Sequence, residues 1–337
     1  MSLAKRFLIF LLVCVCFQSA KADWVKQNSN TFAWLRDVYF LNEQSGWIAG
    51  SGGAFLTTTD GGKTWTQKKK FVEDNIRQVY FANEQTGWVL CERDLFSLGA
   101  NSPSYLLKTG DGGASWERVE FTDNQRKRVT KFFFTKSGSG MAIGEGGAFY
   151  AMQNDGKSWK RVASPVRYLL FDGMFTDDSH GVIVGAGSSI LFTEDAGSTW
   201  NQASVAGNSE AKLNSVFFLN QKNGWTVGSH GKIFQTVNGG KTWREQKTNT
   251  TKDLTDVVFN NSAEGWAVGD EGTVLFTATA GNVWTPVNPP ARHKLERIFF
   301  IGGKGFAVGF GGTILSYDKS NKNTDSSLPA PQLRTRN

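Results

Sequence analysis

Short runs of alternating apolar and polar residues recur along the chain. They are rich in β-branched and aromatic side chains, which is typical of β-strands with one buried face. The seven runs are LRDVYFLN, IRQVYFAN, VTKFFFTK, FDGMFTD, LNSVFFLN, LTDVVFNN and LERIFFIG. We expect a protein built of repeated strands.

A glycine followed by a large apolar residue comes after each run. The seven copies are Gly46-Trp47, Gly87-Trp88, Gly140-Met141, Gly181-Val182, Gly224-Trp225, Gly265-Trp266 and Gly305-Phe306. Successive copies lie 40 to 43 residues apart, except for one interval of 53 between Gly87 and Gly140. The regular period indicates a repeat architecture, and the longer interval indicates an insertion, which we place at residues 93–104.

A third motif, Thr58-Thr59-Asp60-Gly61-Gly62-Lys63-Thr64-Trp65, follows in most units. Asp111 and Asp195 occupy the position of Asp60, Asn238 replaces the acid in a later copy, and the copies at 154–159 and 279–284 are weaker. An Asp or Asn side chain accepts hydrogen bonds from turn amides, glycine adopts positive φ, and Trp begins the next strand. We therefore expect a structural hairpin turn at each copy.

Each unit is thus predicted to contain four antiparallel strands, A to D, which is one blade of a propeller. The fold class is all-β, a single seven-bladed β-propeller over residues 23–318. The last unit ends near Asp318 without a Trp, whereas Trp24-Val25-Lys26-Gln27 resembles Trp65-Thr66-Gln67. We expect this N-terminal strand to complete the last blade and so remove the open edges of the array.

The ends of the chain differ from the repeats. Residues 1–22 have a basic start, an apolar run and an Ala-Lys-Ala site, which predicts a signal peptide and export to a bacterial periplasm or beyond the cell. The apolar run is too short to span a bilayer, so no stable membrane insertion is expected. Residues 319–337 are predicted to form a flexible tail.

Composition narrows the function classes. The formal charge of +7 falls to +4 once Lys5, Arg6 and Lys21 leave with the signal, which is too mild for a dedicated nucleic-acid binder. His180, His230 and His293 are isolated in the sequence, so we expect neither a metal site nor a cofactor. Cys91 is the one cysteine outside the signal and is expected to be a buried apolar residue.

The alternation of Gly-Trp-x-x-Gly with T-x-D-x-G-x-T-W resembles the photosystem II stability and assembly factor family, across residues 23–318. It also resembles the wider group of Asp-box propellers, which includes sialidases. The first resemblance implies a non-enzymatic chaperone that holds an assembly intermediate of a membrane complex, with the thylakoid lumen as its location in a cyanobacterial host. It implies an arginine-rich patch on one face and structural Asp-boxes at Asp60, Asp111, Asp195 and Asn238.

Propeller topology separates two faces. The A–B and C–D turns lie on one face with the Asp-boxes, and the B–C and D–A connections lie on the other. The second face is predicted to bind an acidic or extended protein partner, because guanidinium groups bind carboxylates in pairs of hydrogen bonds. Its candidate residues are Arg36, Arg77, Arg126, Arg128, Arg167, Lys212, Arg292 and Lys294, with Arg93 and Phe96 from the insertion. The alternative is that these loops are basic without a partner, as in any protein with a pI near 9.2.

Two rival functions stay open, an Asp-box glycoside hydrolase of sialidase type and a lectin-like sugar binder. A sialidase-type site needs an arginine triad, a Tyr/Glu pair and an acid at the channel mouth, but Tyr39 and Tyr80 sit at repeat-equivalent positions and are expected to pack. Trp47, Trp88, Trp225, Trp266 and Phe306 are expected to pack between blades. Phe71 is a further contact candidate, and we expect a monomer.

Overall fold

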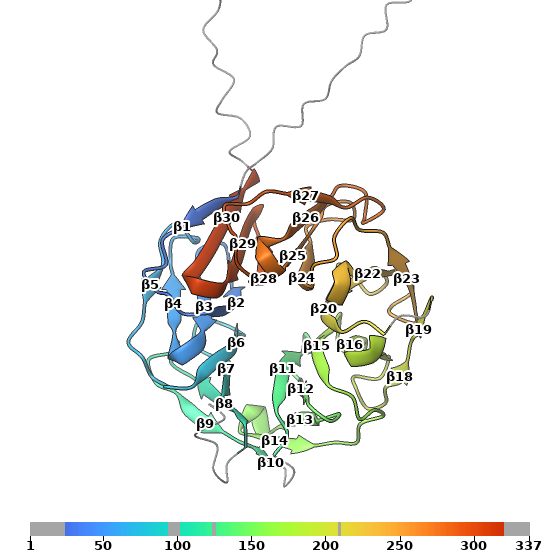
Figure 1. Cartoon of the computed structure of the whole chain (residues 1–337). Helices are drawn as coiled ribbons and strands as arrows, with labels where there is room; N and C mark the ends of the chain where they lie inside the picture. The colour runs from blue at the N-terminus through green and yellow to red at the C-terminus, as the bar shows by residue number, and fades with distance from the viewer. Residues whose placement is uncertain (1–23, 94–101, 123–125, 208–209, 320–337) are drawn as a thin grey trace, which may run out of the picture.

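The described strands form seven sheets arranged around a central axis (Figure 1). The structure is a computed structural model and describes residues 24–93, 102–122, 126–207 and 210–319. The signal peptide, Phe96 and all but the first residue of the predicted tail lie outside the described residues. The prediction of an all-β seven-bladed propeller is confirmed.

The four strands of each blade have the predicted order from the channel outwards. The A strands next to the channel are β2 (Leu35–Phe40), β6 (Asn75–Phe81), β11 (Val129–Phe134), β15 (Leu170–Phe175), β20 (Leu213–Phe218), β24 (Leu254–Phe259) and β28 (Leu295–Ile301). The B strands are β3 (Gly46–Gly50), β7 (Gly87–Glu92), β12 (Gly140–Gly144), β16 (Gly181–Gly185), β21 (Gly224–Gly228), β25 (Gly265–Gly269) and β29 (Lys304–Gly309).

The outer half of each blade follows in the same way. The C strands are β4 (Phe55–Thr58), β8 (Ser104–Thr109), β13 (Phe149–Gln153), β17 (Ile190–Thr193), β22 (Ile233–Thr236), β26 (Val274–Thr277) and β30 (Thr313–Asp318). The D strands are β5 (Thr66–Gln67), β9 (Glu117–Val119), β14 (Ser158–Arg161), β18 (Asn201–Gln202), β23 (Thr242–Gln246), β27 (Thr285–Val287) and, from the N-terminus, β1 (Val25–Gln27).

The glycine-rich B–C connections are tight turns, as expected. The first is the 3-10 turn η1 (Ser51–Gly53). At Gly53 φ is +71°, and a Cβ atom there would lie 1.9 Å from the carbonyl oxygen of Val72. Glycine is required at this point because the connection to the next blade passes directly over the turn.

Large aromatic side chains fill the space between neighbouring blades. Trp47 stacks on Phe81 of the next blade with 3.9 Å between ring centroids, and Trp225 stacks on Phe259 at 3.5 Å. Trp88, Trp266 and Phe306 likewise contact the following blade, through Phe134, Phe300 and Phe40. The prediction that these B-strand aromatics pack between blades is confirmed.

Two single residues singled out in the sequence, Cys91 and Phe71, lie in the interior of the propeller. Cys91 is buried, and burial raises the pKa of its thiol to about 12, as expected for an inert residue. Phe71 stacks on Trp116 at 4.9 Å and is partly buried, so it packs within the propeller, and its contact with a partner stays a prediction.

Two described sheets carry a fifth strand that the repeat did not predict. β10 (Phe121–Thr122) pairs in parallel with β14, and β19 (Ser204–Val205) pairs in parallel with β23. Each is part of the connection between two blades and runs along the outer edge of the second one. It thereby satisfies backbone groups that an edge strand leaves unpaired.

The N-terminal strand closes the ring, as predicted. β1 pairs antiparallel with β30, with Val25 opposite Ser316, and the two ends of the colour range meet there in Figure 1. Trp24 is 3% exposed, and its ring centroid lies 5.5 Å from those of Trp266 and Tyr317. The first and last parts of the propeller therefore share one hydrophobic cluster.

Replacing Trp24 tests how much this closure stabilises the fold. We expect Trp24→Ala to lower the free energy of unfolding by about 3–5 kcal/mol, because it leaves a large cavity in the last blade. Val25→Ala is the matched control, because Val25 is 59% exposed in the same strand. Denaturant unfolding measures both, and equal effects of the two substitutions would contradict a closure held by Trp24.

The Asp-box turns have the predicted structural role. Asp60 Oδ1 accepts hydrogen bonds from the Thr64 amide (3.0 Å) and the Thr58 hydroxyl (2.7 Å), and Oδ2 accepts one from the Thr64 hydroxyl (2.7 Å). The turns at Asp111 and Asp195 repeat this pattern, and Asn238 accepts the equivalent amide bond at 3.0 Å. Hydrogen bonds from Thr64 and then Thr58 lower the pKa of Asp60 to about 2.

This lowered pKa predicts an acid-sensitive contribution to stability. Because the folded-state pKa lies below the usual value of about 3.9, the contribution is complete above about pH 4 and is lost as the pH falls towards 2. We expect Asp60→Asn to reduce the loss of stability over that range, measured by denaturant unfolding at several pH values. Glu84→Gln, at an exposed position in an A–B turn, is the control. An unchanged pH profile in Asp60→Asn would refute the prediction.

Candidate functional site: a basic mouth above a charged ring

A β-bulge occurs near the start of every A strand, and in five of the seven strands two consecutive side chains line one cavity. The register shifts between Leu35 and Asp37 in β2, and the same shift occurs at the equivalent place in the other six A strands. Strict alternation would put Arg36 and Asp37 on opposite faces of the sheet. The bulge re-aims them, so both line one cavity.

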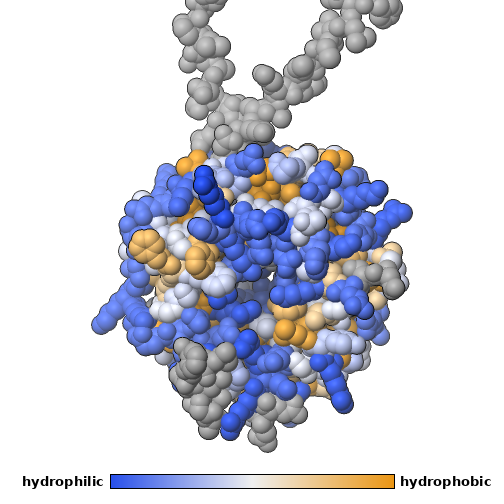
Figure 2. All heavy atoms as spheres, viewed as in Figure 1, coloured by the Kyte–Doolittle hydropathy of each residue, from blue (hydrophilic) through white to orange (hydrophobic). Residues whose placement is uncertain are grey.

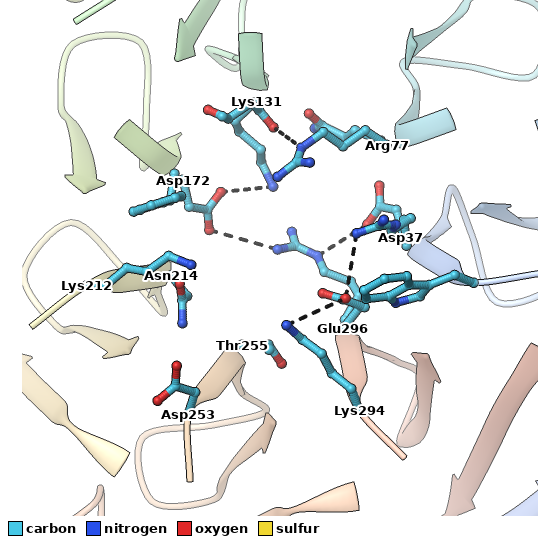
Figure 3. A pocket seen from close by; sticks show the side chains of 16 residues that line it. Asp37, Arg77, Lys131, Asp172, Lys212, Asn214, Asp253, Thr255, Lys294 and Glu296 are labelled. Carbon is cyan, nitrogen blue, oxygen red and sulfur yellow. Dashed lines mark hydrogen bonds and ion pairs between the residues drawn. The ribbon is translucent and has the colours of Figure 1, made fainter. Parts of the chain in front are cut away.

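This cavity has a volume of about 300 Å³ and is strongly polar (Figure 3). It is lined by residues of the A strands and of the D–A connections before them, so it opens on the face predicted to be basic. In Figure 2, hydrophilic side chains surround the central opening of the face in view. Its lining cations are Arg36, Arg77, Lys131, Lys212, Lys294 and Arg297, and its lining acids are Asp37, Asp172, Asp253 and Glu296.

A ring of seven side chains lies at the floor of the cavity, here called the charged ring, and five of its members line the cavity. Each member stands two residues after the apolar residue at which the register of its A strand shifts. The members of the ring are Asp37, Gln78, Lys131, Asp172, Ser215, Asp256 and Arg297. Arg297 Nε lies 3.3 Å from Asp37 Oδ1, and its Nη1 lies 3.3 Å from Asp256 Oδ1 and 3.9 Å from Asp172 Oδ2. A single guanidinium group thus links three blades besides its own.

The three aspartates also join neighbouring blades through the backbone. Asp37 accepts the amide of Val79 at 2.9 Å, Asp172 that of Val216 at 3.0 Å and Asp256 that of Ile298 at 2.8 Å. Lys131 Nζ lies 2.9 Å from Asp172, and the Ser215 hydroxyl oxygen lies 2.6 Å from Asp256 and 3.0 Å from Asp172, within hydrogen-bond distance of both. The charged ring is therefore held by bonds among its own members and to the strands beside it.

Burial and pairing act in opposite directions on these groups. Burial raises the pKa of Asp37 and of Asp256, and Arg297 only partly offsets it. For Asp172, burial also acts to raise the pKa, but Lys131 and Arg297 outweigh it and the pKa is lowered. The pKa of Arg297 is raised because its three aspartates outweigh its own burial.

Five cations lie above the charged ring, and together we call them the basic mouth: Arg36, Arg77, Arg128, Lys212 and Lys294. Glu296 lies 3.8 Å from both Arg36 and Lys294, and Lys294 also lies 3.5 Å from Asp270. Glu92 pairs with Arg77 at 3.0 Å and with Arg128 at 3.1 Å. Burial lowers the pKa of Arg36. The nearby charge of Glu296 opposes this effect, and the positive charge of Arg77 adds to it.

Two aromatic rings support cations of the basic mouth. The guanidinium carbon of Arg36 lies 3.8 Å from the ring centroid of Trp34, and Lys212 Nζ lies 4.6 Å from that of Phe171. Both rings line the polar cavity. Cation–π contacts of this kind orient the charged groups and leave their hydrogen-bond donors directed at the cavity.

The structure separates the remaining candidates from the cavity. Arg126, Arg167 and Arg292 are exposed on D–A connections and do not line it. Arg93 is 8% exposed, its guanidinium lies 4.3 Å from the ring of Tyr105, and it pairs with Glu120 at 3.0 Å. In the structure Arg93 therefore anchors the base of the insertion and presents little surface to a partner.

The charged ring was not predicted from the sequence. Its members stand among β-branched and aromatic residues at equivalent positions of the seven A-strand runs, and every one is polar or charged. A column of polar residues at one position of a repeat was the available signal. It indicates a shared polar environment, because equivalent positions of a propeller meet around one axis.

The geometry differs from that of a sialidase-type site. The guanidinium group of Arg297 is paired with three aspartates, so it is not free to bind a substrate carboxylate. Tyr39 and Tyr80 line the channel on the opposite side of the charged ring from the basic mouth. Among the described residues there is no group of three or more His, Cys, Asp and Glu that could hold a metal ion. In the part of the chain that the structure describes, no helix is long and apolar enough to cross a membrane.

Fold and turns together define a class of protein, the seven-bladed propellers with Asp-box turns. Within that class, the model of a family described as photosynthesis system II assembly factor YCF48 matches residues 17–163, 151–247 and 208–294. These matches cover most of the chain, so the chain belongs to this family. The resemblance noted from the sequence is confirmed.

Individual relatives match over parts of their length. The photosystem II assembly lipoprotein Ycf48 of Synechococcus sp. (strain CC9902) is 34% identical over 87 residues, 25% of this chain and 26% of that protein. The photosystem II assembly protein Ycf48 of Synechococcus sp. (strain JA-2-3B'a(2-13)) is 25% identical over 190 residues, 55% of this chain and 54% of the relative. The chain thus matches about half or less of the length of these relatives.

Solved structures show the same fold at low identity. A structure described as YCF48 bound to D1 peptide has a TM-score of 0.71 and 22% identity, over 88% of this chain and 94% of that one. Virginiamycin B lyase from Staphylococcus aureus has a TM-score of 0.72 but 12% identity, over 87% and 98%. At these identities both show the fold alone.

Removing Arg297 tests the charged ring. We expect Arg297→Met to lower the free energy of unfolding at pH 7 by about 3 kcal/mol, because three buried aspartates lose their shared cation. Arg244→Met, at an exposed position of β23, should change it by less than about 0.5 kcal/mol.

The pH dependence of the same variant gives a second check. Aspartates whose folded-state pKa is raised destabilise the fold as the pH rises through that pKa, and loss of Arg297 raises it further. The deficit of Arg297→Met should therefore shrink as the pH is lowered from 7 to about 5. A deficit that is constant over this range, measured by denaturant unfolding, would argue against the assigned role.

Proposed function

We propose that this protein is an exported, non-enzymatic binding protein that holds an acidic or extended segment of a membrane-complex client at the basic mouth. The observation that carries the proposal is the excess of cations there. Glu296 lies near both Arg36 and Lys294, Glu92 pairs with both Arg77 and Arg128, and Lys294 also lies 3.5 Å from Asp270. Lys212 contacts an aromatic ring, and Asp253 lines the same cavity, so the mouth has five cations and four acids. Carboxylates of a bound segment would complete the charge balance of the mouth.

Membership of the assembly factor family supports this proposal. One solved relative is described as bound to a D1 peptide, and one curated relative is described as a lipoprotein of photosystem II assembly. A peptide client and an extracytoplasmic location for this chain agree with both descriptions. The charged ring beneath the mouth is already held by its own bonds, so the conformational entropy lost on binding comes from the peptide alone.

Charge reversal tests the basic mouth. We expect a labelled peptide rich in Asp and Glu to bind more weakly, by about tenfold or more, to Arg77→Glu combined with Lys212→Glu. Lys63→Glu, at an exposed Asp-box position on the opposite face, is the matched control. Fluorescence anisotropy measures affinity, and added salt should weaken binding to the unaltered protein.

Further measurements distinguish this function from its rivals. A neutral version of the labelled peptide, with Asn and Gln in place of Asp and Glu, should bind poorly. Crosslinking in the native cell envelope should recover a subunit of a membrane complex. A separate series of Arg126→Glu, Arg167→Glu and Arg292→Glu, all outside the cavity lining, determines whether the outer loops contribute. Unchanged peptide affinity in every charge-reversal variant would overturn the proposal, as would turnover of sialosides or β-glucans.

A further inference from the structure

The central channel contains a second cavity, of about 430 Å³, on the other side of the charged ring from the basic mouth. Asp37, Gln78, Lys131, Asp172 and Arg297 line both cavities, so the charged ring is the partition between them. The A strands run from the D–A connections towards the A–B turns. The second cavity, here called the aromatic chamber, therefore lies towards the Asp-box face.

Its walls are the residues two positions beyond the charged ring, because side chains two apart in a strand share one face. These residues are Tyr39, Tyr80, Phe133, Met174, Phe217, Val258 and Phe299. Five of the seven are aromatic. The wall is continuous across blades, since the Tyr39 ring lies 5.2 Å from that of Tyr80 and 5.8 Å from that of Phe299.

The chamber walls are ordered and only partly buried. The Tyr39 hydroxyl donates a hydrogen bond to the Phe81 carbonyl oxygen of the next blade at 2.9 Å. Tyr39, Tyr80, Met174, Phe217 and Phe299 keep intermediate exposure, whereas residues of the blade cores are buried. When an apolar ligand displaces water from partly exposed rings around a preformed cavity, the burial of apolar surface favours binding.

The floor of the chamber favours a neutral occupant. Arg297 and Lys131 are engaged by the three aspartates. The Gln78 amide is engaged too, donating to the Phe132 carbonyl at 2.8 Å and accepting from the Phe132 amide at 2.9 Å. An ionic ligand would find these groups already paired, so the main gain on binding is apolar burial.

A hollow of about 330 Å³ adjoins the chamber on the Asp-box side. It shares Phe217, Val258 and Phe300 with the chamber wall and continues to Gly302 and Gly303 in an A–B turn. Lys319 pairs with Glu264 at 2.9 Å at its edge. An apolar surface thus leads from the chamber to the exterior on the face away from the basic mouth.

We propose that the aromatic chamber binds a small, neutral, ring-containing apolar molecule that enters from the Asp-box face. The chamber volume lies within the range of small-molecule sites, which are mostly apolar with few polar groups. Offset and edge-on contacts with Tyr39, Phe217 and Phe299 would hold the ring of the ligand. This site is separate from the basic mouth and does not depend on peptide binding there.

The neutral fluorophore N-phenyl-1-naphthylamine provides the probe. We expect saturable binding of one molecule per chain with a rise in its fluorescence. Raising the salt to about 1 M should not weaken this binding, in contrast to binding at the basic mouth. Displacement of the probe by the acidic peptide would instead place an apolar side chain of a peptide in the chamber and overturn the proposal.

Variants that fill the chamber locate the bound probe. Val258→Trp and Met174→Trp should each weaken probe binding by at least about tenfold, because the indole occupies the ligand volume. Phe32→Ser is the control, since Phe32 is 95% exposed in the D–A connection on the opposite face. Denaturant unfolding shows which variants fold, and unchanged probe affinity in a folded filling variant would refute the site.

A measurement on the unaltered protein keeps the test independent of the variants. Crystals soaked in the probe should show its difference density between Tyr39, Phe217 and Phe299. Density at another place, or no saturable binding in solution, would overturn the proposal. Because the peptide assay reports on the opposite face, failure here is distinguishable from failure of the proposed function.

Discussion

Seven A strands meet around one axis, and side chains at equivalent positions must share the small space between them. Identical charges there would repel strongly at low dielectric, so a perfect repeat cannot carry an ionised residue at this level. The chain breaks its own repeat at the position of the charged ring, where three aspartates are balanced by Lys131 and Arg297. These ion pairs hold together blades that are far apart in the sequence.

The charged ring also divides the channel into two environments. On one side the bulge adds the preceding residues to the lining, and these include Arg36, Arg77 and Glu296. On the other side strand alternation resumes and brings aromatic side chains to the wall. One polar layer therefore separates a charged cavity on one face from an apolar cavity on the other.

Ring closure and blade packing give this arrangement its rigidity. The stacks of Trp47 on Phe81 and of Trp225 on Phe259 bind each blade to the next, and Trp24 joins the first strand to the last blade. In the described part of the chain the outer edges of two blades are covered by the added strands β10 and β19. A closed and edge-protected ring holds the channel side chains in place without a disulfide, since Cys91 is unpaired.

The sequence by itself determined the number of blades, the strand order, the Asp-box turns and the closing strand, because these depend on local patterns repeated at a fixed period. It also placed Arg36, Arg77, Lys212 and Lys294 on the correct face, since topology alone separates the faces. Only the tertiary structure decided which of them meet and that Arg93 is buried. The bulge overrides simple alternation, and contacts across the axis join residues more than a hundred positions apart, such as Asp172 and Arg297.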